Sequence, residues 1–214
     1  MSKLLIPLAV LFIIVGSIQS LAAPIAHDPT AQSEAGVLVE QMRGISMQPQ
    51  WARSDGTIDP QEQRRQEIED KLRMIGKECV PALVRALNDP DVQMRRNADL
   101  VMIFLAGGYG EKTKVDIREA LPALIKATAD SDTHVRSWAA LAISEIGPDA
   151  KEAVPILIKL LKDSDEGSRN NSCIALGRIG PVAKDALPAL QKALNDPSKD
   201  VRRFAHHAIE EIEK

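Results

Sequence analysis

Aromatic residues, cysteines and an excess of basic charge are all scarce in this sequence of 214 residues. Phe, Trp and Tyr make up 3 % of it while 44 % is hydrophobic, so small and aliphatic side chains form most of the core. Such a composition suits closely packed helices and suits strands poorly. Lys and Arg total 27 against 30 Asp and Glu, a net charge of −3, whereas proteins that grip a phosphate backbone usually carry a basic surplus. We therefore expect no nucleic-acid partner.

The two cysteines, Cys79 and Cys173, are predicted to be free thiols. The repeat described below places them two units apart, on the order of 20 Å if helix layers are spaced about 8–10 Å. A disulfide joins Cα atoms that lie about 4.4–6.8 Å apart.

The N-terminus has the three parts of a secretory signal. Lys3 is followed by an apolar run over residues 4–18, and Ser20-Leu21-Ala22 puts small residues at the −3 and −1 positions of a cleavage site. We expect a signal peptide over residues 1–22 and an exported protein, periplasmic or extracellular. An uncleaved anchor is the alternative, and it is the one case in which we expect a membrane contact.

Residues 23–60 mix Pro, Gly, Ser, Gln and charge, and are predicted to be a flexible linker before a repeat domain at 61–214. Within the linker, residues 30–42 are a candidate short helix with Val37, Leu38, Val39 and Met42 apolar. Trp51 is expected to cap the first repeat.

Four ten-residue segments align without gaps, each with proline as its second residue: 80–89, 121–130, 154–163 and 187–196. Counted from these prolines, the spacings are 41, 33 and 33 residues. Asp stands at position +8 and Arg at +14 in every copy: Asp89, Arg95, Asp130, Arg136, Asp163, Arg169, Asp196 and Arg202. Recurrence of this kind identifies an internal repeat.

Each repeat is predicted to fold as two helices. Apolar residues at −1, +2, +3 and +6 form one stripe, and those at +13, +17, +20, +21 and +24 form another. Gly147 and Gly180 follow the second helix, where a left-handed cap residue is favoured. Residues 61–75 are expected to supply the second helix of an incomplete leading repeat, and the extra residues 107–114 a flexible surface loop.

These units resemble the HEAT-repeat family, most closely its short bacterial form, which also occurs in phycobilisome-lyase-like proteins. The residues that carry the match are Ala153-Val154-Pro155-Ile156-Leu157, Asp163, Arg169 and Ile179-Gly180. The resemblance implies an all-α, right-handed solenoid of about four HEAT-like helix pairs preceded by a half repeat. It also implies that the recurring Asp and Arg residues form a structural ladder between neighbouring repeats.

No residue pattern in the sequence points to catalysis, a cofactor or a metal. Neither His-x-x-x-His nor Cys-x-x-Cys occurs to hold a metal ion. Cys173 and His206 share position +18 of consecutive repeats, but one layer, roughly 10 Å, would separate them. We therefore expect a protein that is not an enzyme.

Solenoids bind through an extended concave face, and the second helices are predicted to line it. Positions +15, +18 and +22 lie opposite the buried stripe and are expected to contact a protein or peptide partner, with these residues as the candidates: Arg96, Asp99, Ser137, Ala140, Asn170, Cys173, Arg203 and His206. The neighbouring columns +16, +19 and +23 hold Trp138, Leu141, Phe104, Ile174 and Phe204, which are expected to pack between repeats. A rival surface is the basic column at +4, Arg85, Lys126, Lys159 and Lys192, which favours an acidic partner or anionic lipid.

The sequence thus predicts an exported scaffold for protein–protein interaction. The alternative that the resemblance brings is a bilin-lyase-like enzyme or accessory factor, because bilin lyases attach chromophores to phycobiliproteins.

Overall fold

The computed structural model describes residues 33–45, 60–107 and 114–214. The expected signal segment 1–22, the linker residue Trp51 and residues 108–113 of the insertion lie outside these ranges. All regular elements within the ranges are helices, and none of these helices is long and apolar enough to cross a bilayer.

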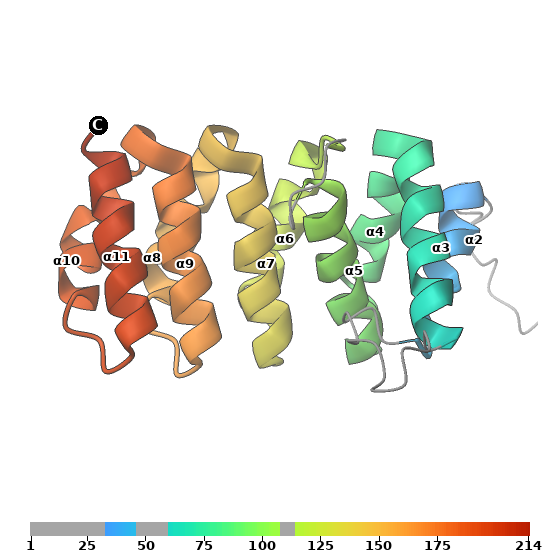
Figure 1. Ribbon diagram of the computed structural model, residues 1–214, viewed down its shortest axis with the longest axis horizontal. Coiled ribbons are helices and arrows are strands. Elements are labelled where there is room, and N and C mark those ends of the chain that lie inside the picture. The colour runs from blue at the N-terminus through green and yellow to red at the C-terminus, as the bar shows by residue number, and fades with distance from the viewer. Residues whose placement is uncertain (1–32, 46–59, 108–113) are drawn as a thin grey trace, which may run out of the picture.

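Four helix pairs follow one another along the chain. They are α4 (Val80–Ala86) with α5 (Val92–Leu105), α6 (Leu121–Ala127) with α7 (Thr133–Ile146), α8 (Val154–Leu160) with α9 (Glu166–Ile179), and α10 (Leu187–Ala193) with α11 (Lys199–Ile212). Figure 1 shows the second helices α5, α7, α9 and α11 side by side in the front row, with the first helices behind them. The predicted all-α solenoid of four helix pairs is confirmed.

The ends of these helices follow from local sequence. Each first helix carries its repeat proline in the first turn, where a missing N–H costs nothing. Each second helix starts from a side-chain cap, Asp91, Asp132, Asp165 or Ser198, which accepts a hydrogen bond from a backbone N–H of the first turn. Gly147 and Gly180 adopt φ of 70° and 72° after α7 and α9, as their positions predicted. Short 3-10 segments, such as Gly147–Ala153 and Gly180–Ala186, then lead into the next first helix.

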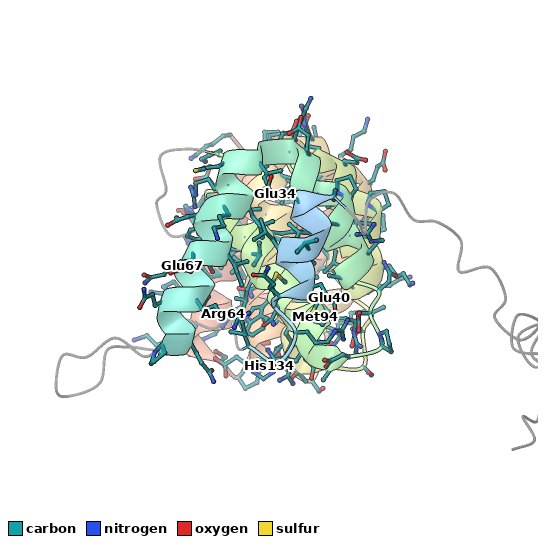
Figure 2. All side chains as sticks on the ribbon, turned by 90° about the vertical axis from the view of Figure 1, so that its right-hand side faces the viewer. Glu34, Glu40, Arg64, Glu67, Met94 and His134 are labelled. Carbon is teal, nitrogen blue, oxygen red and sulfur yellow. The ribbon has the colours of Figure 1, made fainter. Side chains whose placement is uncertain are left out.

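The leading half repeat is α3 (Pro60–Ile75), and a short helix, α2 (Glu34–Glu40), stands beside it where a first helix would be. Figure 2 looks onto this end of the solenoid and shows α2, with Glu34 and Glu40, beside α3, with Arg64 and Glu67. Ser33 caps α2 by accepting a hydrogen bond from the N–H of Gly36.

The short helix that the sequence offered as a candidate over 30–42 is present as α2, and residues 33–45 are packed on the repeats rather than flexible. Ala35, Leu38 and Met42 are 3, 5 and 0 % exposed and belong to the main core. The apolar residues of this segment cover the first repeat, and that burial outweighs the polar composition around it.

Polar contacts fix the same segment to α5. The side-chain amide of Asn97, which is fully buried, donates to the carbonyls of Met42 and Ile45 at 3.0 and 2.7 Å. Arg43 binds the carboxylate of Asp89 at 2.9 Å. The segment thus supplies the contacts that a preceding repeat would make.

Candidate interaction surface on the second helices

The residues predicted to face a partner at position +18 lie inside the solenoid instead. Asp99, Ala140 and Cys173 are each 0 % exposed. His206, in the last repeat of the chain described, has a side chain that is 68 % exposed. The +18 column therefore faces the following repeat, and Asp99 and Ala140 are not open to a partner as predicted. Cys173 is also buried, although it lines a groove described below.

Position +15 also faces the following repeat. Arg96 binds Asp132 of the next repeat, with Nε to Oδ1 at 2.9 Å. Ser137 is 9 % exposed and accepts a hydrogen bond from the side-chain amide of Asn171 at 2.9 Å. Asn170 is half-buried, with its side-chain oxygen enclosed, and only Arg203, at 66 %, is well exposed.

Close approach between second helices explains the small residues in these columns. A Cβ added to Gly177 would lie 3.1 Å from the Cα of Ala208 on the next helix. One added to Gly167 would lie 2.9 Å from Oγ of Ser137. The small side chains make room for the neighbouring helix, and two of them, Cys173 and Gly177, also line the groove described below.

The columns expected to be packed between repeats form the outer surface. Trp138, Leu141, Ile174 and Phe204 are half-buried and pack on the core with one side only. We call these four residues the second-helix stripe. They occupy +16 and +19 of repeats two to four, one residue beyond the predicted columns, which is a rotation of about 100° around the helix.

The stripe ends in a groove between α9 and α11. The groove has a volume of about 560 Å³, and apolar side chains and glycines form most of its wall. Its lining residues are Pro148, Cys173, Ile174, Gly177, Arg178, Ile179, Gly180, Pro181, Phe204, His207, Ala208, Glu211 and Lys214. Volumes of about 300–1,000 Å³ are typical of small-molecule sites, so the groove has room for a few peptide side chains.

Paired charges border the stripe at position +23. Arg178 donates to Glu145 of the preceding repeat at 2.6 Å, and Lys214 donates to Glu211 at 2.6 Å. Two of the aromatic rings also contact nitrogen-bearing side chains. His134 makes an edge contact with Trp138, with 5.1 Å between the ring centroids, and the Arg203 guanidinium lies 4.7 Å from the centroid of the Phe204 ring.

In the first repeat the same columns are covered. Asn97 and Leu100 are 0 and 5 % exposed, and the guanidinium of Arg73 on α3 lies 4.1 Å above the ring of Phe104. The half-buried apolar residues that these N-terminal elements leave uncovered therefore lie on α7, α9 and α11.

The recurring Asp and Arg residues form three rungs between consecutive repeats. Arg95, Arg136 and Arg169 bind Asp130, Asp163 and Asp196 through Nε and Nη2, with Nε–Oδ2 distances of 2.8, 2.9 and 2.8 Å. Each Arg also donates from Nη1 to the carbonyl of the Asp at +8 in its own repeat. Arg202 makes this second contact, to Asp196 O at 2.6 Å, and has no carboxylate partner among the described residues.

At the other end, Asp89 takes its partner from outside the repeat pattern. That partner is Arg43. The sequence did not reveal this ion pair, because Arg43 lies in a segment predicted to be a linker. The Arg43 hydrogen bond holds the pKa of Asp89 below its usual value. Hydrogen bonds from Arg136 and Arg169 lower the pKa of Asp163 and Asp196 in the same way.

The thiols are unsuited to chemistry at neutral pH. Cys79 and Cys173 are free, as predicted, and both are buried. Desolvation raises the pKa of each to about 12, so the reactive thiolate is rare. The described part of the chain contains no group of three His, Cys, Asp or Glu residues placed to hold a metal ion.

The rival basic column lies on the first helices, away from the stripe. Lys126, Lys159 and Lys192 are exposed and Arg85 is half-buried. Lys126 donates to Oδ1 of Asn88 at 2.6 Å.

Comparisons with known proteins agree with this architecture. Residues 121–210 match the family model described as HEAT repeats. A chain from the complex of CpcE and CpcF of phycocyanin lyase from Nostoc sp. PCC7120 is 18 % identical, with 85 % of this chain and 99 % of that chain covered and a TM-score of 0.62.

Two designed proteins have the same fold. A computationally designed armadillo repeat protein for modular peptide recognition is 24 % identical over 81 % of this chain and 79 % of its own, with a TM-score of 0.53. An engineered protein is 21 % identical over 84 % and 79 %, with a TM-score of 0.54. No curated protein matches the sequence.

Proposed function

We propose that this chain, of which residues 121–210 match the HEAT-repeat model, is a scaffold that binds a segment of another protein along the second-helix stripe and the α9–α11 groove. The observation that carries the proposal is the set of half-buried apolar side chains Trp138, Leu141, Ile174 and Phe204 on three successive second helices. In a monomer such a set leaves apolar area in water, and a partner that covered it would gain about 25 cal/mol per Å².

The shape of this surface favours an extended or helical peptide segment. The stripe follows successive helices rather than enclosing a closed cavity, and only its far end deepens into a groove. Aromatic anchors such as Trp138 and Phe204 are the residue types that dominate binding energy at protein interfaces. Two of the structural neighbours support a protein or peptide partner, one being a complex of CpcE and CpcF and the other a design for modular peptide recognition.

Peptide selection with the purified protein tests the proposal. Peptides would be selected from a random displayed library, and their affinities measured by fluorescence polarisation. We expect Ile174→Glu and Phe204→Glu each to weaken binding by at least about tenfold, the loss of one hot-spot residue. Met74→Glu is the matched control, because Met74 is an apolar side chain that is 85 % exposed on α3, far from the stripe.

Charge reversal separates the two candidate surfaces. Lys126→Glu with Lys159→Glu should leave binding to the stripe unchanged, and added salt should have little effect. If this pair abolishes binding while Ile174→Glu is silent, the basic column is the binding surface and the stripe is not.

We also propose that the scaffold works outside the cytoplasm. The motive is the series of Lys3, the apolar run over 4–18 and Ser20-Leu21-Ala22. N-terminal sequencing of the cellular protein should find a chain that begins at Ala23. An intact Met1 in a cytoplasmic pool would contradict export.

The bilin-lyase alternative has the fold in its favour and nothing more specific. At 18 % identity the phycocyanin lyase chain shares the architecture with this one, and no residue role follows from that. Incubation of the protein with a bilin and a phycobiliprotein would test it, and covalent attachment of the chromophore would overturn the scaffold proposal.

A further inference from the structure

Asp99 is a buried acid in the junction between the first two repeats. We propose that it is held there as the neutral carboxylic acid, and that its ionisation with rising pH loosens the junction between α5 and α7. This inference is independent of the proposed binding function, since it concerns a different face of the helix.

The position of Asp99 carries the argument. The side chain is 0 % exposed, and neither carboxyl oxygen has a hydrogen-bond partner among the described residues. Ala140 and Cys173, which occupy the same column one and two repeats later, are also fully buried against the next helix. Asp99 therefore stands where the next two repeats have a small, uncharged residue; the fourth repeat has His206, which is exposed.

The nearest basic groups are engaged elsewhere. Arg95 uses Nε and Nη2 for Asp130, and Nη1 for the carbonyls of Asp89 and Pro90. Arg96 uses Nε and Nη2 for Asp132. An ionised Asp99 would have no donor to compensate for the water it lost.

Charged groups on the elements packed against α5 have partners of their own or are exposed. On α7, His134 is exposed beside Trp138, Arg136 binds Asp163 and Glu145 binds Arg178. On α3, Arg65 pairs with Glu69, and Arg73 lies over Phe104. The one charged residue of α4 is Arg85, near its C-terminal end.

Burial raises the pKa of Asp99 well above its usual value, and the negative charge of Asp130 adds to this while Arg95 opposes it. A carboxyl whose pKa is higher in the folded state stabilises the fold fully below the unfolded pKa, and this stability is lost as pH rises toward the folded pKa. Within that window the unfolding equilibrium constant grows about tenfold for each pH unit. The ladder carboxylates have lowered pKa values, so their contribution is constant above about pH 5.

Thermal unfolding between pH 5 and pH 8 tests the proposal with three variants of the protein. The wild type should lose stability as pH rises, and Asp99→Ala, which copies Ala140, should remove most of that loss. Ala140→Asp should introduce the same pH dependence at the next junction. Asp185→Asn, at an exposed acid, should leave the wild-type pH profile unchanged.

The carboxyl ¹³C resonance of Asp99 in the wild type gives a second readout that needs no stable variant. A neutral-acid chemical shift at pH 6, changing only at higher pH, supports the proposal. A carboxylate shift at pH 6, or equal pH profiles for the wild type and Asp99→Ala, would overturn it. Amide exchange confined to α5 and α7 should accelerate together with the titration if the junction is what opens.

Discussion

Removing Arg136 tests whether the Asp–Arg ladder holds the repeats together. Its guanidinium binds Asp163 of the next repeat through Nε and Nη2, both at 2.9 Å. Its Nη1 spans the carbonyls of Asp130 and Ser131 at 2.9 and 3.1 Å. The two charged side chains are 14 and 15 % exposed, so the rung is neither a surface ion pair nor a fully buried one.

The expected cost of Arg136→Ala lies between those two limits. Exposed ion pairs contribute about 0–1 kcal/mol, and stripping one partner from a buried pair costs about 3–5 kcal/mol. Asp163 keeps one hydrogen bond, from the N–H of Asp165 at 2.8 Å, which softens the loss. We expect a destabilisation of about 2 kcal/mol, the range of a hydrogen bond to a charged group. For a chain of this size that lowers the melting midpoint by about 4–8 °C.

Arg202→Ala is the matched control because Arg202 makes the backbone contacts of its column without a carboxylate. The difference in unfolding free energy between the two variants, measured by urea unfolding, isolates the contribution of the Arg136–Asp163 ion pair. A pH series gives a second readout: the lowered pKa of Asp163 adds stability above its unfolded pKa, and this is lost as pH falls through the folded pKa. Arg136→Ala should therefore lose less stability than the wild type does as the pH falls. Equal midpoints for Arg136→Ala and Arg202→Ala would refute a structural ladder.

Three further predictions follow from burial and close packing. Cys79 and Cys173 should resist a thiol reagent in the native state and react when urea unfolds the protein, because burial raises the pKa of each to about 12; rapid native labelling would contradict this. Gly177→Val should lower the melting midpoint by several degrees, since its Cβ would lie 3.1 Å from the Cα of Ala208; an unchanged midpoint would show that the helices shift at little cost. Asn97→Leu should destabilise the contact with residues 33–45, because it removes the amide that donates hydrogen bonds to the carbonyls of Met42 and Ile45. Limited proteolysis should then cut this segment first. An unchanged cleavage pattern would show that apolar packing alone holds the segment in place.

The fold was predictable because the same kinds of local sequence signal recur from repeat to repeat. Proline in each first helix, a capping side chain before each second helix and glycine after α7 and α9 are local signals, and each repeat supplies them again. The N-terminal cap was harder to place. Its polar composition predicted a linker, and the pairing of Arg43 with Asp89 joins residues 46 positions apart that no repeat spacing relates.

Most of the predicted contact residues at +15 and +18 face the next repeat rather than solvent, and the reason is geometric. Periodicity within one repeat shows which side of a second helix packs on its own first helix, and the opposite side was taken to be open. In this solenoid, however, α5, α7 and α9 each also have a second helix on either side, with α3 as the one before α5. Such a helix is thus buried on three sides. Its exposed part is narrow, and it is rotated by about 100° around the helix from the side that lies opposite the core stripe.

Side-chain size distinguishes the two kinds of column once this packing is recognised. Ser137, Ala140 and Gly177 are small because a neighbouring backbone passes close to them, as the 3.1 Å approach of Ala208 to a Cβ at Gly177 shows. On the outer surface, packing does not require a large side chain. The second-helix stripe nevertheless consists of large residues, namely Trp138, Leu141, Ile174 and Phe204. Packing on the core accounts for the buried part of each of these four side chains, and the part that remains exposed is what the proposed partner would cover. In the first repeat the equivalent columns are covered by residues 33–45 and α3, so the second-helix stripe begins where the chain's own capping elements end.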